Sequence, residues 1–138
     1  MPPLVKGVVS VWLASVLAVG CADKAAPEYV ADQFADAYFR RMDQQSARQF
    51  TALGATEMLD RELDLVHSVR AQGYTPEQAA AHVVCQRKSR TTRGDRVRFD
   101  YDIAIRHDEG EEHRSADVEL AKIQSAWKVV RIDVRPRS

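Results

Sequence analysis

Tyr101 is the residue that acid–base chemistry could use most directly, because it lies in a run where apolar and charged residues alternate with the period of a β-strand. An inward tyrosine can donate a hydrogen bond to an oxyanion, but proton transfer also needs a carboxylate base beside it. The alternation places Asp100 and Asp102 on the face opposite Tyr101. We therefore predict no catalytic residue on the central strands and no enzymatic activity. The other strand carboxylates expected on that outer face are Asp117, Glu119 and Asp133.

Two histidines flank an acidic turn, a composition that also occurs in metal sites. His107 and His113 stand on either side of residues 108–112. In the predicted hairpin, His113 pairs with Asp108 on the outer face and His107 pairs with Arg114 on the other face, so the imidazoles point apart. We predict a solvated hairpin tip there, with no bound metal and no other cofactor.

A run of basic residues contains a single acid, Asp95. It could contact lipid headgroups, phosphorylated polysaccharide or an acidic protein. The interpretation we favour is that it neutralises Asp100, Asp102 and Glu119 on the same sheet face and protects an edge strand. Nucleic acid is not an expected partner, because 20 basic residues balance 20 acidic ones. The possible basic surface consists of Arg87, Lys88, Arg90, Arg93, Arg96 and Arg98.

The elements that must position these residues begin with helices. Pro27 suits a first helical turn, and the apolar residues after it recur at three- and four-residue steps. We expect a break at 43–46, a short turn that ends at Gly54, and a third helix over 56–71. Residues 75–78 have the capping pattern of a further helix start. The apolar stripe of the first helix consists of Val30, Phe34, Ala37, Tyr38 and Met42.

From residue 83 the hydrophobic period changes from about 3.6 to 2, which predicts four antiparallel strands after the helices, an α+β arrangement. Gly110 and Glu111 suit the tip of one hairpin, and residues 124–126 suit a three-residue loop in the next. The resulting register buries one apolar face. The expected pairs are Tyr101–Leu120, Ile103–Val118 and Ile105–Ala116 in the first hairpin, and Ala116–Val134, Val118–Ile132 and Leu120–Val130 in the second.

Residues 1–20 differ from everything that follows them. Lys6 precedes an uncharged run at 8–19, which is too short for a bilayer-spanning helix of about twenty residues. A positive start, a short apolar segment and the small residue Gly20 are typical of a cleaved export signal. We expect residues 8–19 of this signal peptide to be helical and detached from the domain.

The segment Leu17-Ala18-Val19-Gly20-Cys21 resembles the lipobox of bacterial lipoproteins. The resemblance implies cleavage before Cys21, acyl chains such as palmitate on that residue, and a short tether at 21–26 before a domain at 27–138. Because Ala22 rather than aspartate follows the cysteine, it also implies a place in the cell envelope, on the outer membrane facing the periplasm. Cys85 is then the only other thiol, and we expect it to be a buried small hydrophobe.

The order of one long helix, two shorter helices and a sheet ending in Trp127-Lys128-Val129-Val130-Arg131-Ile132 resembles the nuclear-transport-factor-two-like (NTF2-like), or cystatin-like, domains. That resemblance implies helices packed in a curled four-stranded meander that often leaves an apolar pocket. The possible pocket-lining residues are Phe34, Tyr38, Tyr101, Ile103 and Val118.

Two functional hypotheses follow from these resemblances. The first is a non-catalytic, membrane-anchored lipoprotein that binds an envelope partner protein or an apolar ligand. The alternative is a lipid-tethered enzyme of the ketosteroid-isomerase-like or cyclase-like kind. An inward carboxylate within hydrogen-bond reach of a second polar group in a cavity would favour the enzyme. Asp36 and His82 are candidates whose orientation the pattern leaves open.

Overall fold

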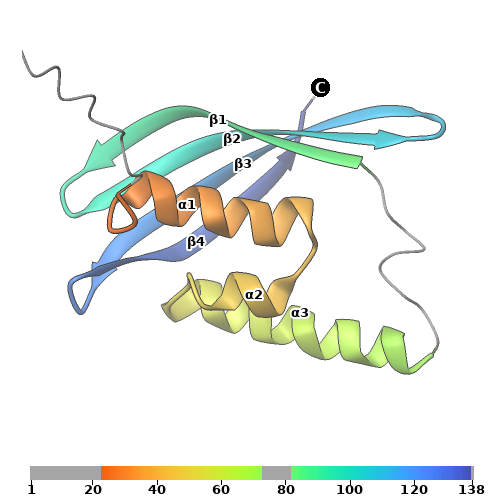
Figure 1. Ribbon diagram of the computed structural model, residues 1–138, viewed down its shortest axis with the longest axis horizontal. Coiled ribbons are helices and arrows are strands. Elements are labelled where there is room, and N and C mark those ends of the chain that lie inside the picture. The colour runs from red at the N-terminus through yellow and green to blue at the C-terminus, as the bar shows by residue number, and fades with distance from the viewer. Residues whose placement is uncertain (1–22, 73–81, 138) are drawn as a thin grey trace, which may run out of the picture.

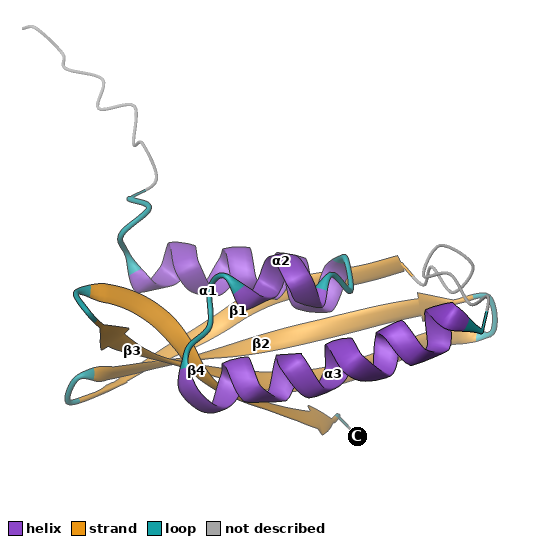
Figure 2. Cartoon of the chain, turned by 90° about the horizontal axis from the view of Figure 1, so that it is seen from below, coloured by secondary structure: helices purple, strands orange, loops and turns teal. Residues whose placement is uncertain are grey.

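The domain consists of a curved sheet with helices along one side of it (Figures 1 and 2). The computed structural model describes residues 23–72 and 82–137. The predicted α+β class with a four-stranded antiparallel meander is confirmed. The strands lie in chain order and are β1 (His82–Arg93), β2 (Arg96–His107), β3 (Gly110–Ile123) and β4 (Ala126–Pro136).

The first helix, α1 (Pro27–Ala35), continues directly into a π-helical turn, η1 (Asp36–Arg40). Its apolar stripe is shorter than we expected. Met42 has a φ of 52° and is 50% exposed, so it lies beyond the helix and outside the core. The wide turn ends where the N–H of Arg41 donates to the carbonyl of Asp36. Such local π-turns are not signalled by hydrophobic period.

The second helix, α2 (Gln44–Arg48), begins after Asp43, whose carboxylate accepts a hydrogen bond from the N–H of Ser46 at 3.0 Å. Asp43 therefore caps the N-terminus of α2 by satisfying a free backbone N–H of that helix. A new helix begins here, which agrees with the break that we predicted at 43–46.

The third helix, α3 (Leu53–Ala71), starts earlier than predicted, and Gly54 lies in its first turn instead of ending the preceding one. The cause is a tertiary contact. The N–H of Ala52 donates to the carbonyl of Val129 at 2.9 Å, and the N–H of Val129 donates to the carbonyl of Phe50 at 2.8 Å. This pairing with β4 fixes where the helix can begin. The helix start predicted at 75–78 and the signal segment at 1–20 lie outside the described residues.

The core fills the space between α1 and the concave face of the sheet. Phe34 of α1 is 0% exposed and Phe99 of β2 is 1% exposed. Ala31, Ala35 and Ala37 are also buried, and their small side chains let the helix backbone approach the sheet closely. The other large side chains that are fully buried are Leu59, Val97, Val118, Leu120 and Val129.

The β2–β3 hairpin keeps the predicted faces but not the predicted register. His107 lies opposite Gly110, so the turn is formed by Asp108 and Glu109. Every pair is displaced by four residues, and Ile103 faces Arg114 where Val118 was expected. An even displacement leaves each side chain on its own face, so alternation alone could not distinguish the two registers. The displaced register places the side chain of Arg114 at the open end of the concave face.

The β3–β4 hairpin confirms the pairs Val118–Ile132 and Ala116–Val134. The third expected pair is wrong, because a β-bulge after Glu119 places Leu120 opposite Val129. The loop is also shorter than predicted. Gln124 and Ser125 form a two-residue turn with positive φ angles of 50° and 70°. Such turns usually carry glycine or asparagine, so these residue types did not indicate one.

Replacing Phe34 with alanine should lower the free energy of unfolding by about 3–5 kcal/mol, because it leaves a cavity in a closely packed core. The control is Leu65→Ala on the exposed side of α3, where the side chain is 68% exposed. Urea denaturation of both variants measures the difference. A Phe34→Ala midpoint equal to that of the parent protein would show that α1 packs elsewhere.

Candidate functional site

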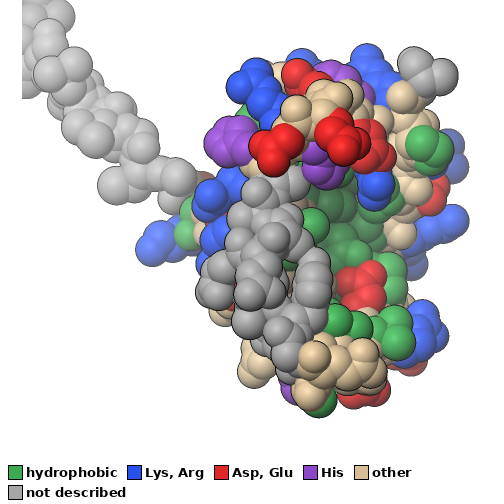
Figure 3. Space-filling model, turned by 90° about the vertical axis from the view of Figure 1, so that its right-hand side faces the viewer, with side chains coloured by type: hydrophobic (Ala, Val, Ile, Leu, Met, Phe, Trp, Pro, Cys, Tyr) green, Lys and Arg blue, Asp and Glu red, His purple; other side chains and the backbone are tan. Residues whose placement is uncertain are grey.

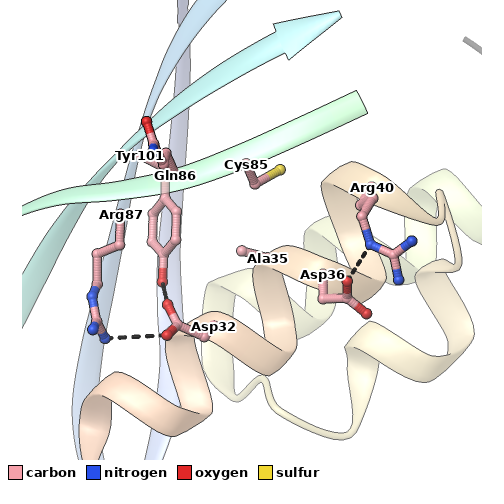
Figure 4. Close-up of a pocket in the computed structure, with 8 residues that line it drawn as sticks. All are labelled: Asp32, Ala35, Asp36, Arg40, Cys85, Gln86, Arg87 and Tyr101. Atoms are coloured by element: carbon pink, nitrogen blue, oxygen red, sulfur yellow. Dashed lines mark hydrogen bonds and ion pairs between the residues drawn. The ribbon is translucent and has the colours of Figure 1, made fainter. Parts of the chain in front are cut away.

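A cavity of about 250 Å³ opens between α1–η1 and the strands β1 and β2 (Figure 4). Its wall from the helix carries two carboxylates, Asp32 and Asp36, which are four residues apart and so lie on one side of the helix. Its wall from the sheet carries the phenol of Tyr101. The complete lining is Asp32, Ala35, Asp36, Arg40, Cys85, Gln86, Arg87 and Tyr101.

Asp32 joins three elements through two contacts. The hydroxyl of Tyr101 donates to its Oδ1 at 2.6 Å, and Arg87 lies 3.3 Å from its Oδ2 (Figure 4). Burial, followed by the hydrogen bond to Asp32, raises the pKa of Tyr101 well above its ordinary value. The phenol is therefore protonated at neutral pH and acts as a donor. The contacts connect α1 to both β1 and β2.

The other side of the cavity holds Asp36, Arg40 and Cys85. Arg40 donates to Asp36, and this bond lowers the pKa of the carboxyl group. The thiol of Cys85 packs against the core and is half-buried. Desolvation, together with the nearby charge of Asp36, raises its pKa to about 11. At neutral pH the thiol is therefore protonated, which makes it a poor nucleophile.

A β-bulge in β1 brings two arginines to the concave face. Arg87 and Arg90 are three residues apart and would face opposite sides of a regular strand. The irregularity between Arg87 and Ser89 places Arg87 opposite Tyr101 and Arg90 opposite Phe99. Their guanidinium carbons lie 5.4 and 6.0 Å from the centre of the Phe99 ring. Arg90 also pairs with Glu28 in the first turn of α1.

A second, more apolar hollow of about 350 Å³ lies at the open end of the concave face, between η1, α3 and the sheet. Tyr38 of η1 donates to Glu62 of α3 at 2.7 Å beside it, and burial raises the pKa of this phenol. Figure 3 views this end of the molecule and shows hydrophobic side chains in a recess beneath a group of acidic ones. The hollow is lined by Tyr38, Phe39, Met42, Gln44, Glu62, Val83, Ile103, Ile105, Arg114 and Val134.

Solved structures resemble this chain over most of its described length. One is a domain from Thiobacillus denitrificans that has been assigned as a calcium/calmodulin-dependent protein kinase type II association domain. It aligns with a TM-score of 0.56 and 14% identity, and the alignment covers 82% of this chain and 96% of that domain. A variant of the NTF2 protein Rd1NTF2_05 has a TM-score of 0.52 and 16% identity, covering 81% and 97%. Bd1075 from Bdellovibrio bacteriovorus has a TM-score of 0.53 and 10% identity, covering 80% of this chain but 39% of its own.

The chain has an NTF2-like fold. At these identities the likeness concerns the fold alone. No protein-family profile matches the sequence, and no curated protein matches it.

Within this NTF2-like fold, the predicted pocket residues are divided among three places. Tyr38 and Ile103 line the apolar hollow, whereas Tyr101 lines the polar cavity. Phe34 and Val118 are fully buried in the core and reach neither space.

The central carboxylates lie where the alternation placed them. Asp102 and Asp117 pair with Arg137 and Arg135 at 2.8 and 2.9 Å on the outer side of the sheet. The carboxylate that reaches Tyr101 comes instead from α1. A signal for Asp32 was present, since it stands four residues before Asp36 and directly beside the apolar stripe. The bulge that directs Arg87 inward had no such signal.

The two histidines contact different glutamates. His107 lies 3.7 Å from Glu112, and His113 lies 3.3 Å from Glu111, on opposite faces of the hairpin. Their pairing partners, Gly110 and Ala104, correct the expected ones. Within residues 23–72 and 82–137, no three His, Cys, Asp or Glu side chains are placed to hold a metal ion. In the same part of the chain, no helix has the length and apolarity needed to cross a bilayer.

The reactivity of Cys85 should follow its raised pKa. In a Cys21→Ser variant, Cys85 is the only thiol. We expect iodoacetamide to alkylate it slowly at pH 8 and progressively faster up to about pH 11. Because the folded-state pKa lies above the ordinary value of 9.0, the stability that the protonated thiol contributes is present below pH 9.0 and is lost toward pH 11. Mass spectrometry measures the rate; a plateau below pH 9.0 would contradict the assignment.

Proposed function

We propose that this chain is an envelope lipoprotein whose NTF2-like domain binds a small apolar ligand without catalysing a reaction. The observation that carries the proposal is the hollow of about 350 Å³ at the open end of the sheet. Its size is within the range of small-molecule sites, and aliphatic side chains with a few polar groups at the edge are the usual lining of such sites. Arg114 and the Tyr38–Glu62 pair would orient a polar end of the ligand.

The polar cavity supports a binding domain over an enzyme. A ketosteroid-isomerase-like reaction needs the substrate between a base and an oxyanion donor. Here the donor and the carboxylate contact each other, since Tyr101 donates its single hydroxyl hydrogen to Asp32 at 2.6 Å. The remaining oxygen of Asp32 faces Arg87. The phenol and the carboxylate thus satisfy each other's hydrogen bonding, and their contact joins the helix to the sheet.

One observation favours the alternative, a lipid-tethered enzyme. Asp32 is a carboxylate within hydrogen-bond reach of a second polar group in an open cavity, which is the arrangement that would mark an acid–base site. A substrate that separated Tyr101 from Asp32 would expose both a donor and a base. An enzyme of this kind would use the polar cavity, whereas the binding domain uses the apolar hollow.

The anchor rests on the first 21 residues. A positively charged start, a short apolar run and the sequence Leu17-Ala18-Val19-Gly20-Cys21 support lipidation of the cysteine and residence in the envelope. Several acyl chains would hold the domain at a membrane far more firmly than a single chain.

Replacing Cys21 with serine should abolish acylation, because serine lacks the thiol that receives the lipid. Cells expressing the parent or the variant are fed an alkyne fatty acid, and the label on the purified protein is measured. Cys85→Ser is the matched control and should keep the full label. Equal labelling of the parent protein and Cys21→Ser would refute the anchor.

Filling the apolar hollow should reduce ligand capture. Ile105→Trp should weaken binding of the neutral dye N-phenyl-1-naphthylamine by at least about tenfold, whereas Val84→Trp, on the outer face and 48% exposed, should not. Dye fluorescence titrations measure both, with melting temperatures to confirm folding. Equal dye affinity in the parent and Ile105→Trp would place the apolar site elsewhere.

A further inference from the structure

The two ends of the domain differ in the charges that they carry. One end of the domain is formed by the start of α1 and by the β1–β2 and β3–β4 turns, and the opposite end contains the β2–β3 turn (Figures 1 and 2). The β2–β3 end carries Asp108, Glu109, Glu111 and Glu112 against three arginines, Arg106, Arg114 and Arg137, the last of which donates its backbone N–H to the carbonyl of His113. The first end, which we call the basic pole, carries Lys24, Arg90, Arg93, Arg96, Arg98, Lys122 and Lys128 against Asp23, Glu28, Asp95 and Glu119.

The carboxylates of the sheet pair partly with the basic pole and partly with arginines near the end of β4. We expected the basic run to neutralise Asp102, but the C-terminal Arg137 occupies that carboxylate at 2.8 Å. Arg96 approaches Glu119 at 3.5 Å, as expected. Together with Arg93, Arg98, Thr91 and the carboxylate of Glu119, Arg96 lines a small hollow of about 50 Å³. Guanidinium groups gathered in this way match the oxygens of a phosphate group.

We propose that the basic pole docks on the anionic phospholipid headgroups of the membrane that carries the lipid anchor. Cys21 precedes Pro27 by a tether that spans at most about 20 Å when extended. The tether leaves the domain within the basic pole, because α1 begins there and its Glu28 pairs with Arg90. A tether of this length lets the basic pole approach the membrane to within a Debye length of about 8 Å, where the surface potential acts on its cations.

An aromatic side chain at the same pole supports a membrane surface as the partner. Trp127 lies near the β3–β4 turn and is partly exposed, and the ammonium group of Lys122 stands 5.5 Å from its ring centre. Tryptophan beside a cation is typical of protein segments at the headgroup level. In this orientation the apolar hollow and the acidic β2–β3 turn face away from the membrane. The domain would then present its ligand site to the surrounding compartment.

The test uses the lipidated protein expressed in cells from a gene carrying Trp12→Phe, so that Trp127 is the only tryptophan in both the cleaved and the uncleaved chain. The purified protein is incorporated into vesicles of phosphatidylcholine, with or without phosphatidylglycerol, that contain a lipid with a nitroxide on its headgroup. We expect quenching of Trp127 in the phosphatidylglycerol vesicles, and we expect salt to weaken it. Arg93→Glu with Arg98→Glu should reduce the ratio of docked to undocked domain, measured from this quenching, by about tenfold. Arg61→Glu with Arg106→Glu, two exposed arginines outside the basic pole, should leave that ratio unchanged.

Equal quenching in both kinds of vesicle, or equal losses in both double variants, would overturn the proposal. If inorganic phosphate at matched ionic strength abolished the quenching of Trp127 in phosphatidylglycerol vesicles, the arginines would be a free-anion site and the proposal would be overturned. Docking of the basic pole rests on one part of the proposed function, the lipid anchor at Cys21, which orients the domain. Failure of the anchor shows as unchanged fatty-acid label in Cys21→Ser, whereas failure of docking shows as lost lipid selectivity in a protein that still carries the label.

Discussion

The close approach of α1 to the concave face of the sheet is the constraint on which the rest of the structure depends. Alanines at positions 31, 35 and 37 are buried against the strands, and Phe34 fills the space between them. A larger residue at any of these alanines would push the helix outward and open the core. Because the helix lies so close, Asp32 reaches Tyr101. At the other end of the helical segment, Tyr38 of η1 bonds to Glu62 of α3. The two hollows are the spaces that remain on either side of this segment.

The polar cavity and the apolar hollow differ in how far their polar groups are already bonded within the protein. In the polar cavity, Tyr101 and Arg87 both bond to Asp32, so the main effect of these groups is to hold α1, β1 and β2 together. In the apolar hollow, the strand positions present aliphatic side chains, and the four-residue displacement of the β2–β3 hairpin adds Arg114 at the edge. Binding of an apolar molecule with a polar end is the activity that this division supports best.

The fold class could be predicted from the sequence because the hydrophobic period within one segment shows whether that segment is a helix or a strand and which of its faces is buried. Alternation from Val97 to Arg106 fixed which side chains face inward, and the fold confirms those faces for Phe99, Tyr101 and Ile103. Register within a hairpin was less accessible, since an even displacement satisfies the same pattern. The candidate site depended on features with still weaker signals, namely a bulge at Arg87 and a carboxylate at the border of a helical stripe. The bulge and the position of this carboxylate both depend on the packing of the helix against the sheet, and the pattern of a single segment does not show that packing.

The most direct test of the account is a double-mutant cycle on Asp32→Asn and Tyr101→Phe, measured as free energies of unfolding. If the contact between these residues joins the helix to the sheet, each substitution should destabilise the domain, and the two effects should couple by about 0.5–3 kcal/mol. Groups held for catalysis often reduce stability, and their removal then stabilises the fold. A stabilised Asp32→Asn protein with no coupling to Tyr101→Phe would contradict the structural role and favour an acid–base site.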